Sequence, residues 1–318
     1  MKRLEAIDQF RGFAILLMIL ANYMNNVSVI PAWLKHADDI GYTVIDLIAP
    51  MFIFAMGLTY GLSFQRRLGR AGAWDTYQHF LIRYLALLGL GYLITLVWEL
   101  SGILPPSVNW GLLQALGAAG LIALPFIHLT TGWRFGIGLG ILTIYQLLLD
   151  RFWLEDVLIA PHNGPWGAMS WGAMLILSTA MADLYHDHRH SRWAYPVLSA
   201  GLVAISLLLS LLVPLSKDRA SASYVLLSLG LSGLVFYGFH LLYEFWRLKL
   251  PILTDWGRNP LMLYLLHYVL LALFALPPIP AWYVQASLWL VVLQLSTLIG
   301  VLSWGGHYLN KRKLYFAL

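Results

Sequence analysis

A histidine and an aspartate stand ten residues apart, in a segment that begins at His36 and ends at Asp46. A neutral imidazole beside a carboxylate is what a general base requires, because the carboxylate fixes the tautomer and stabilises the imidazolium after proton transfer. The same residues have a simpler interpretation. Thr43-x-x-Asp46 before an apolar run matches a helix-capping box, and His36 could be an exposed loop histidine. Spacing leaves both interpretations open.

The apolar run before this segment carries polar residues on one face. Asp8 and Arg11 are three residues apart, so on a helix they can form an ion pair, although Arg11 could equally be an interfacial anchor. Asn22 follows eleven residues later, which is roughly 16 Å along a helix and, at about 100° per residue, nearly the same face. We therefore expect a cation at one end of this face and an amide near mid-membrane. The simpler role for the amide is an interhelical hydrogen bond.

Further polar residues fall within later apolar runs. His267 lies about halfway along one of them, where a titratable group is costly, so we expect a buried partner or a cavity. Asn259 opens the same run, and Gln114 lies at the outer end of an earlier one, where it could line a pocket. A satisfied structural histidine is the alternative role for His267.

Two other kinds of site are not expected. The chain has no cysteine, which excludes a thiolate nucleophile and a cysteine-based zinc site. The segment His186-Asp-His188-Arg-His190 resembles a metal-binding cluster, but it stands among basic residues and is interpreted as a solvated loop. We therefore expect no bound metal.

The elements that must position these residues are membrane helices. The chain has 318 residues, of which 60% are hydrophobic and 11% charged, whereas soluble domains have about 25% charged residues. This composition excludes an ordinary soluble enzyme and predicts an all-α, polytopic integral membrane protein with a single transmembrane domain over residues 1–318. About ten spans are expected from apolar runs at 11–30, 43–64, 79–98, 111–129, 135–149, 164–184, 194–214, 222–243, 259–277 and 283–305.

The basic residues predict the orientation of these spans. With the N-terminus inside, fourteen Lys and Arg fall on cytoplasmic segments and four on outside loops. This bias predicts that both termini lie in the cytoplasm, and it explains the net charge of +5 without a nucleic-acid partner. The cytoplasmic residues are Lys2, Arg3, Arg66, Arg67, Arg70, Arg134, Arg189, Arg192, Arg247, Lys249, Arg258, Lys311, Arg312 and Lys313.

The order of these residues resembles the heparan-alpha-glucosaminide N-acetyltransferase family, as a minimal, bacterial-type member. The resemblance is dense over residues 3–57 and sparse over 110–117 and 257–267. The opening Asp-x-x-Arg is shared by a broader superfamily of transmembrane acyltransferases, whereas the pattern over 22–57 is more specific. The matching residues are Arg3, Asp8, Arg11, Gly12, Asn22, Tyr23, Lys35, His36, Ala37, Gly41, Thr43, Val44, Asp46, Leu47, Pro50, Phe52, Phe54, Met56, Gly57, Gln114, Gly117, Gly257, Asn259, Tyr264 and His267.

The resemblance implies acetyl transfer from cytoplasmic acetyl-CoA to an amino sugar on the other side of the inner membrane. His36 is then expected near the extracytoplasmic side, as a general base or a transient acyl carrier. Asn22 would stabilise the oxyanion and Asp46 would orient His36. The expected contacts to the cofactor are Arg11, Asp8, Asn259, His267 and Gln114. The partners are the acceptor and the lipid bilayer, and a homodimer is left open.

One departure from the family and two alternatives remain. The family often has Gln-Arg-Leu-Gly where this chain has Gln114-Ala115-Leu-Gly, so any polar contact by that arginine is missing or is supplied elsewhere. Within enzymes, the alternative is transfer of another acyl group, or transfer to a hydroxyl of a periplasmic or cell-surface glycan. From a different class, a small-molecule transporter also places polar residues at mid-span. Pro260 has no clear counterpart in the first half of the chain, which counts against a transporter built from two related halves.

Overall fold

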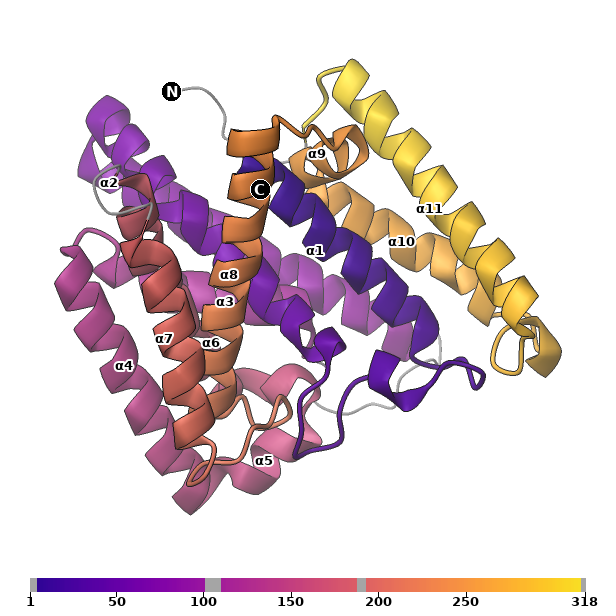
Figure 1. The fold of residues 1–318 in the computed structure, drawn as a ribbon, viewed down its shortest axis with the longest axis horizontal. Helices are drawn as coiled ribbons and strands as arrows, with labels where there is room; N and C mark the ends of the chain where they lie inside the picture. The colour runs from indigo at the N-terminus through magenta and orange to yellow at the C-terminus, as the bar shows by residue number, and fades with distance from the viewer. Residues whose placement is uncertain (1–4, 101–109, 188–192, 316–318) are drawn as a thin grey trace. The chain divides into compact units, whose positions relative to one another are not determined.

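The computed structural model describes residues 5–100, 110–187 and 193–315 of the protein. The described residues form helices joined by turns and contain no β-strand, which confirms the predicted all-α class (Figure 1). Lys2, Arg3, His188, Arg189, His190 and Arg192 lie outside these residues. The helices are α1 (Glu5–Met24), α2 (Ile48–Leu100), α3 (Leu112–Ala123), α4 (Thr131–Leu148), α5 (Leu154–Ile159), α6 (Gly164–His186), α7 (Ala194–Leu209), α8 (Ala222–Trp246), α9 (Pro251–Arg258), α10 (Pro260–Ala275) and α11 (Leu288–Lys311).

All ten predicted apolar runs coincide with helices. The expected count of about ten membrane spans is wrong, because fewer helices of the structure could cross a membrane. Within the described ranges, four helices are long and apolar enough to cross a membrane, or five if α9 and α10 are one span bent by 95°. They are Val44–Val97, Thr131–Ile159, Ala222–Trp246 and Leu288–Lys311. The expected orientation, with both termini inside, stays a prediction.

The difference in number has a physical reason. Helices α3, α7 and α10 have only 12 to 16 residues, and a helix that crosses the hydrocarbon core needs about 20. Helix α1 is long enough, but it carries Asp8 and Gln9, which are buried within the protein. A helix enclosed by other helices does not need an apolar surface all round, so hydropathy alone misjudges its position.

Helix α2 is too long for one span and is broken within its length. It runs for 53 residues, and Gly72 interrupts it with φ of 82°. This left-handed backbone conformation is one that glycine adopts without steric cost. The break separates the two apolar runs that the sequence predicts at 43–64 and 79–98.

Backbone contacts group the chain into two compact units. Unit 1 comprises Met1–Ala37, Thr43–Phe52 and Val235–Ala317, and unit 2 comprises Asp38–Tyr42 and Ile53–Leu234. The predicted single transmembrane domain stays a prediction.

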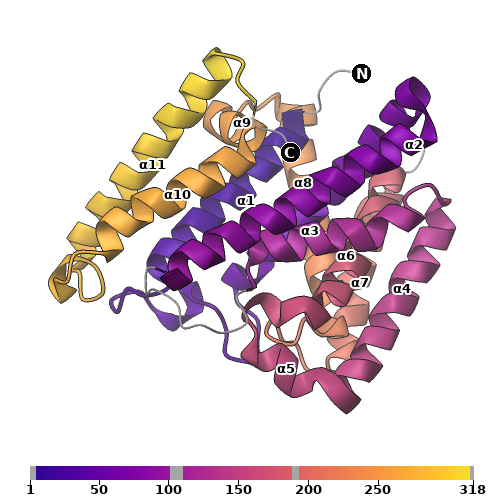
Figure 2. The same cartoon turned by 180° about the vertical axis from the view of Figure 1, so that it is seen from behind.

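Unit 1 is built around α1 and the short helix α9. The two backbones approach closely because glycine stands on each side: a Cβ on Gly257 would lie 1.8 Å from the Asp8 carbonyl oxygen, and one on Gly12 would lie 1.9 Å from the Leu253 carbonyl oxygen. Helices α10 and α11 pack beside them, with α9 at one end (Figures 1 and 2). Small residues that let backbones meet are typical of helix packing in membranes.

Unit 2 has α6 at its centre. Most residues of α6 are buried, and the helix packs against α3, α4 and α7. Close approach again depends on glycine, since a Cβ on Gly172 would lie 2.6 Å from Ile122 and one on Gly138 would lie 2.7 Å from Leu177. At the end of α6, Asp183 pairs with the buried Arg134 of α4.

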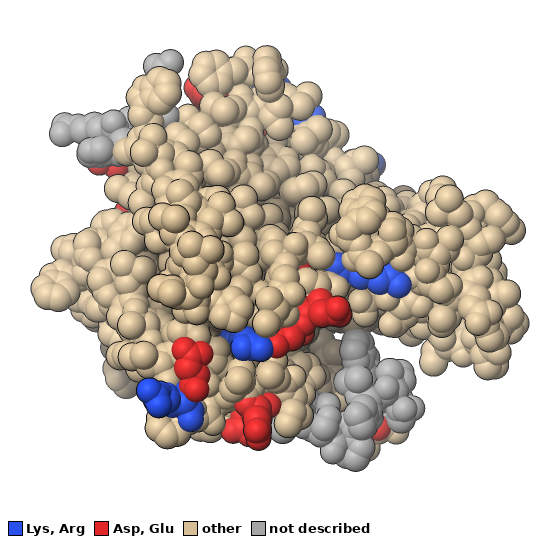
Figure 3. Space-filling view, turned by 60° about the horizontal axis from the view of Figure 1, so that its bottom comes forward, with Lys and Arg blue, Asp and Glu red and all other residues tan. Residues whose placement is uncertain are grey.

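The surface reflects the scarcity of charge. On the face drawn in Figure 3, few Lys, Arg, Asp and Glu side chains interrupt a broad uncharged surface. Large exposed apolar residues recur along α11, among them Leu288, Trp289, Val292, Leu293 and Trp304. Exposed apolar helix faces of this kind indicate contact with lipid, and we conclude that this is a membrane protein.

The glycine contact between α1 and α9 predicts a sharp difference between two alanine substitutions. Gly257→Ala would force the two helices apart and lower the free energy of unfolding by about 1–3 kcal/mol or more. Thermal unfolding of the purified protein in detergent measures the loss. Gly69→Ala in α2 is the matched control, because a Cβ there meets nothing within 4 Å and alanine favours the helix by about 0.5–1 kcal/mol. Equal melting temperatures for the two variants would contradict the prediction.

Candidate functional site

The histidine and aspartate singled out from the sequence meet in the structure. His36 Nδ1 lies 2.8 Å from Asp46 Oδ1. Because a carboxylate only accepts hydrogen bonds, Nδ1 donates, and the lone pair of a neutral imidazole is then on Nε2. The Asp46 side chain is fully buried, whereas 39% of the His36 side chain is exposed. The ring is therefore fixed on one edge and accessible to a substrate.

The second oxygen of Asp46 holds the turn that carries it. Asp46 Oδ2 accepts hydrogen bonds from the backbone nitrogens of Thr43, at 2.9 Å, and Ala37, at 3.2 Å. The Thr43 hydroxyl lies 3.1 Å from the same oxygen and donates to the Lys35 carbonyl at 2.8 Å. One carboxylate thus caps the turn and holds the histidine, so the two interpretations of the spacing describe different oxygens of one residue. The catalytic role of the pair stays a prediction.

The other polar pair joins α1 to α10. Asn22 Nδ2 lies 2.9 Å from His267 Nε2, and His267 Nδ1 contacts the Tyr264 carbonyl oxygen. A carbonyl oxygen only accepts, so Nδ1 donates to it and Nε2 accepts from the Asn22 amide. His267 is fully buried, and the Tyr268 ring packs on it with a centroid distance of 4.1 Å. His267 thus has the buried partner that its position requires.

The three predicted catalytic residues therefore fall into two pairs, His36 with Asp46 and Asn22 with His267. Helix α1, which carries Asn22, packs against the turn Val44–Leu47, which carries Asp46. That the two pairs act as one site stays a prediction.

The other end of α1 carries the expected ion pair and a partner that the sequence analysis did not include among the site residues. Arg11 Nη1 lies 3.7 Å from Asp8 Oδ1, and Arg258 Nε lies 3.8 Å from Asp8 Oδ2. Two guanidinium groups thus share one buried carboxylate. Arg258 stands next to Asn259, in a segment whose spacing pointed to Asn259 and His267, but spacing cannot show a contact 250 residues away.

Arg258 also connects to the last helix. Its Nη1 donates to Asn310 Oδ1 at 2.9 Å, Asn310 contacts Asp255, and His307 Nδ1 lies 3.1 Å from the second Asp255 oxygen. Asn259 is fully buried at the 95° bend between α9 and α10. The end of unit 1 that bears Arg11 is therefore rich in cations and cross-linked by polar contacts.

Gln114 lies in unit 2 and makes structural contacts there. Its side-chain oxygen accepts from the Gly111 nitrogen at 3.1 Å, at the start of α3, and its nitrogen lies 3.4 Å from the Thr95 hydroxyl of α2. It is almost fully buried. Its expected contact with a cofactor stays a prediction.

A bidentate ion pair that the spacing did not reveal lies in the loop between His36 and Asp46. Arg219 Nε donates to Asp39 Oδ1 at 2.8 Å and to Oδ2 at 3.1 Å, and the Ser216 hydroxyl donates to Oδ1 at 2.9 Å. The Arg219 guanidinium holds the pKa of Asp39 below its ordinary value. The pair anchors residues 38–42 to the loop after α7, within unit 2.

The histidine cluster after α6 has no metal-binding geometry in the part that the structure covers. His186 Nε2 lies 3.1 Å from the Leu58 carbonyl oxygen, and His188 and His190 are outside the described residues. Across residues 5–100, 110–187 and 193–315, no group of three or more His, Asp or Glu could hold a metal ion.

Comparison with known proteins identifies the family. A family model described as "Heparan-alpha-glucosaminide N-acetyltransferase, catalytic" matches residues 3–240. The chain belongs to this family. The match confirms the resemblance found in the sequence and includes both His36 and Asp46, whereas Asn259 and His267 lie beyond it.

Two curated relatives carry the same description. The Homo sapiens protein "Heparan-alpha-glucosaminide N-acetyltransferase" is 44% identical over 62 residues, and the Mus musculus protein of that name is 42% identical over 62 residues. Each alignment covers 19% of this chain and 9% of the relative. The chain therefore matches only a small part of the length of these relatives.

The two contacts of Asp46, with the turn and with His36, can be separated by substitution in this member of the heparan-alpha-glucosaminide N-acetyltransferase family. In Asp46→Asn, one amide atom can still accept from the Thr43 nitrogen, but an amide that presents its nitrogen to His36 would favour the wrong tautomer. We expect acetyl transfer to fall by a factor of about a hundred or more, with little change in thermal stability.

Thr43→Val is the matched variant for this prediction. It removes the hydroxyl that touches Asp46 Oδ2 and leaves the His36 contact, so it should lower stability without a comparable loss of kcat. Steady-state kinetics and melting in detergent compare the two variants. If both lose activity in proportion to stability, Asp46 acts only as a cap.

Proposed function

We propose that the protein transfers an acetyl group from cytoplasmic acetyl-CoA to the amine of an amino sugar on the other side of the inner membrane. The family match supports acetyl transfer. The observation that carries the proposal is the 2.8 Å contact between His36 and Asp46, because it gives an accessible imidazole a basic nitrogen. The excess of basic residues on the expected cytoplasmic segments supports the sidedness.

In the proposed reaction, the acceptor amine attacks the thioester carbonyl and His36 Nε2 takes its proton. The tetrahedral intermediate collapses as the C–S bond breaks, and the imidazolium returns the proton to the sulfur of CoA. Asp46 stabilises the imidazolium while it exists. The products are the N-acetylated amino sugar and free CoA.

A covalent route uses the same residues. His36 Nε2 attacks the thioester, CoA leaves, and the amine then takes the acetyl group from the acetyl-imidazole. In either route negative charge develops on the carbonyl oxygen, and the Asn22 amide is the proposed donor to it. One N–H of Asn22 is directed to His267, and the same side chain hydrogen-bonds to Tyr268, so an oxyanion would replace one of these two contacts.

Arg11 is the proposed contact for the phosphates of CoA. It stands on the face of α1 that also carries Asn22, roughly 16 Å away along the helix, which leaves room for an extended thioester arm. Arg258 Nε lies 3.8 Å from the other oxygen of Asp8, so two guanidinium groups lie beside one buried carboxylate. Two guanidinium groups near one carboxylate favour an anionic ligand.

Reconstituted protein tests the activity. Liposomes with acetyl-CoA outside and glucosamine inside should release free CoA and form N-acetylglucosamine, and His36→Ala should slow both by a factor of about a hundred or more. His128→Ala is the matched control, because His128 is an exposed histidine of unit 2 whose Nδ1 lies 3.1 Å from the Tyr77 hydroxyl. It should retain wild-type rates.

The same assay separates the alternatives. Equal CoA release by wild type and His36→Ala would overturn the mechanism. Acetylation of a glycan hydroxyl but not of glucosamine would favour the O-acyltransferase. Movement of a small molecule across the bilayer with no CoA release would favour a transporter. The bend at Asn259 resembles the interrupted helices of transporters.

His267 is proposed to position Asn22 rather than to bind the cofactor. His267→Ala should lower kcat by about tenfold or more and leave KM for acetyl-CoA unchanged, because it frees the Asn22 amide to rotate. His267→Gln can still accept from Asn22 and should recover part of kcat. A rise in KM with kcat unchanged would instead support the cofactor contact expected from the sequence.

A further inference from the structure

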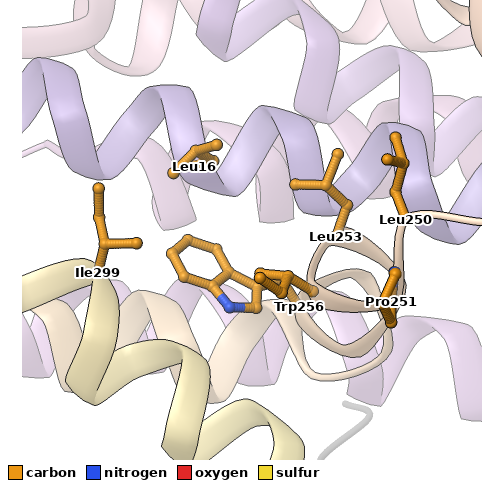
Figure 4. A pocket seen from close by; sticks show the side chains of 7 residues that line it. Leu16, Leu250, Pro251, Leu253, Trp256 and Ile299 are labelled. Atoms are coloured by element: carbon orange, nitrogen blue, oxygen red, sulfur yellow. The ribbon is translucent and has the colours of Figure 1, made fainter. Parts of the chain in front are cut away.

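Unit 1 contains a cavity that the proposed reaction does not use. It has a volume of about 370 Å³ and lies among α1, α9 and α11. Its lining is Leu16 of α1, Ile299 of α11 and, from the segment at the start of α9, residues 250–253 and Trp256. Figure 4 shows the Trp256 indole between Leu16 and Ile299.

The lining of the cavity is apolar and disfavours bound water. None of the seven lining side chains is charged, and the Trp256 indole supplies their single polar atom. A buried water needs two to four polar partners, so a cavity with such walls favours an apolar chain.

The cavity lies beside a segment that has the composition of a membrane interface. Helices α9 and α10 meet at 95°, so they do not form one straight span. The residues just before α9 fit such an interface. Phe245 is 64% exposed and Trp246 is 73% exposed, and aromatic residues gather where hydrocarbon meets headgroups.

Two cations lie close to the cavity lining along the chain. Arg247 and Lys249 are exposed, and Leu250, which lines the cavity, follows Lys249 directly. The nearest carboxylate after them, Asp255, is buried and paired with His307 and Asn310, and Glu244 lies one turn before them in α8. An apolar cavity next to two basic residues matches a ligand with an alkyl chain and an anionic head.

We propose that this cavity binds one acyl chain of an anionic phospholipid, whose phosphate pairs with Arg247 and Lys249. The choice of an anionic head follows from charge, since a zwitterionic head brings its own cation close to these residues. The site is separate from the proposed transfer of acetyl groups and does not depend on it.

Binding of single-chain lipids to the wild-type protein tests the proposal without any substitution. Delipidated protein in a neutral detergent is titrated with palmitoyl-lysophosphatidylglycerol, palmitoyl-lysophosphatidylcholine and glycerol 3-phosphate, and native mass spectrometry counts the bound molecules. We expect one saturable site for the anionic lysolipid, about fivefold or more weaker binding of the choline lipid, and none of glycerol 3-phosphate. Equal binding of the two lysolipids, or binding of glycerol 3-phosphate alone, would overturn the proposal.

Substitutions locate the site. Ile299→Phe fills the cavity and should abolish the saturable binding. Val292→Phe is the control on the same helix, because Val292 is 55% exposed, and this variant should still bind the lipid. The double variant Arg247→Gln/Lys249→Gln should bind the anionic lysolipid about as weakly as the wild type binds the choline lipid. Its control is Arg151→Gln/Lys217→Gln, with the same change of charge in unit 2.

These measurements use no acetyl-CoA, so an inactive protein can still bind the lipid and an active one can fail to. If the cavity and control variants bind alike, the lipid does not occupy this cavity. Gel filtration in detergent identifies a misfolded variant, and the wild-type titration then decides the proposal alone.

Discussion

The contact between α1 and α9 governs the geometry of unit 1. Gly12 and Gly257 let the two backbones meet, and this contact brings the Asp8 carboxylate within reach of Arg258. Helix α10 follows α9 after the bend, and it carries His267 to Asn22 near the far end of α1. A side chain larger than hydrogen at either glycine would alter both polar ends of α1 together.

A second constraint acts at the start of α2, where a single carboxylate has two tasks. Backbone N–H groups at a turn need acceptors, because an unpaired buried donor costs about 1–3 kcal/mol. Asp46 meets that need with Oδ2 and leaves Oδ1 for His36. The capping bonds fix the carboxylate that contacts the imidazole, so the orientation of the histidine depends on the fold of the turn.

The sequence predicted the elements of this structure better than their relation to the membrane. Each of the ten apolar runs marked a helix, because local hydropathy is enough to mark a long helix in such a chain. The short helices α5 and α9 lie outside these runs. The number of spans was wrong because α1 buries Asp8 and Gln9 inside the protein, because α3, α7 and α10 are short, and because two runs fall in the one long helix α2. The mostly buried α6 is also not among the candidate spans. Neither the burial of a residue nor the 95° bend at Asn259 is a local property of the sequence.

The same limit explains which parts of the candidate site were foreseen. His36 and Asp46 lie ten residues apart, so a single loop brings them together and their spacing was informative. Asn22 and His267 were each singled out, but their contact joins residues 245 positions apart. The ion pair of Arg219 with Asp39 joins residues 180 positions apart. Long-range pairs of this kind depend on how helices pack, which a single sequence does not encode in any local pattern.

The shared carboxylate of Asp8 bears on how the proposed cofactor would be attracted. An ion pair of Arg11 with Asp8 alone would be neutral and would offer an anion little. With Arg258 on the second oxygen, two positive charges face one negative charge, and both distances, 3.7 and 3.8 Å, are longer than a close hydrogen bond. Arg258 is also held by its hydrogen bond to Asn310 at 2.9 Å, so its charge stays at this end of α1 if Arg11 turns to a phosphate. The proposed attraction of the cofactor therefore depends on both cations, one fixed by the fold and one at the surface of α1.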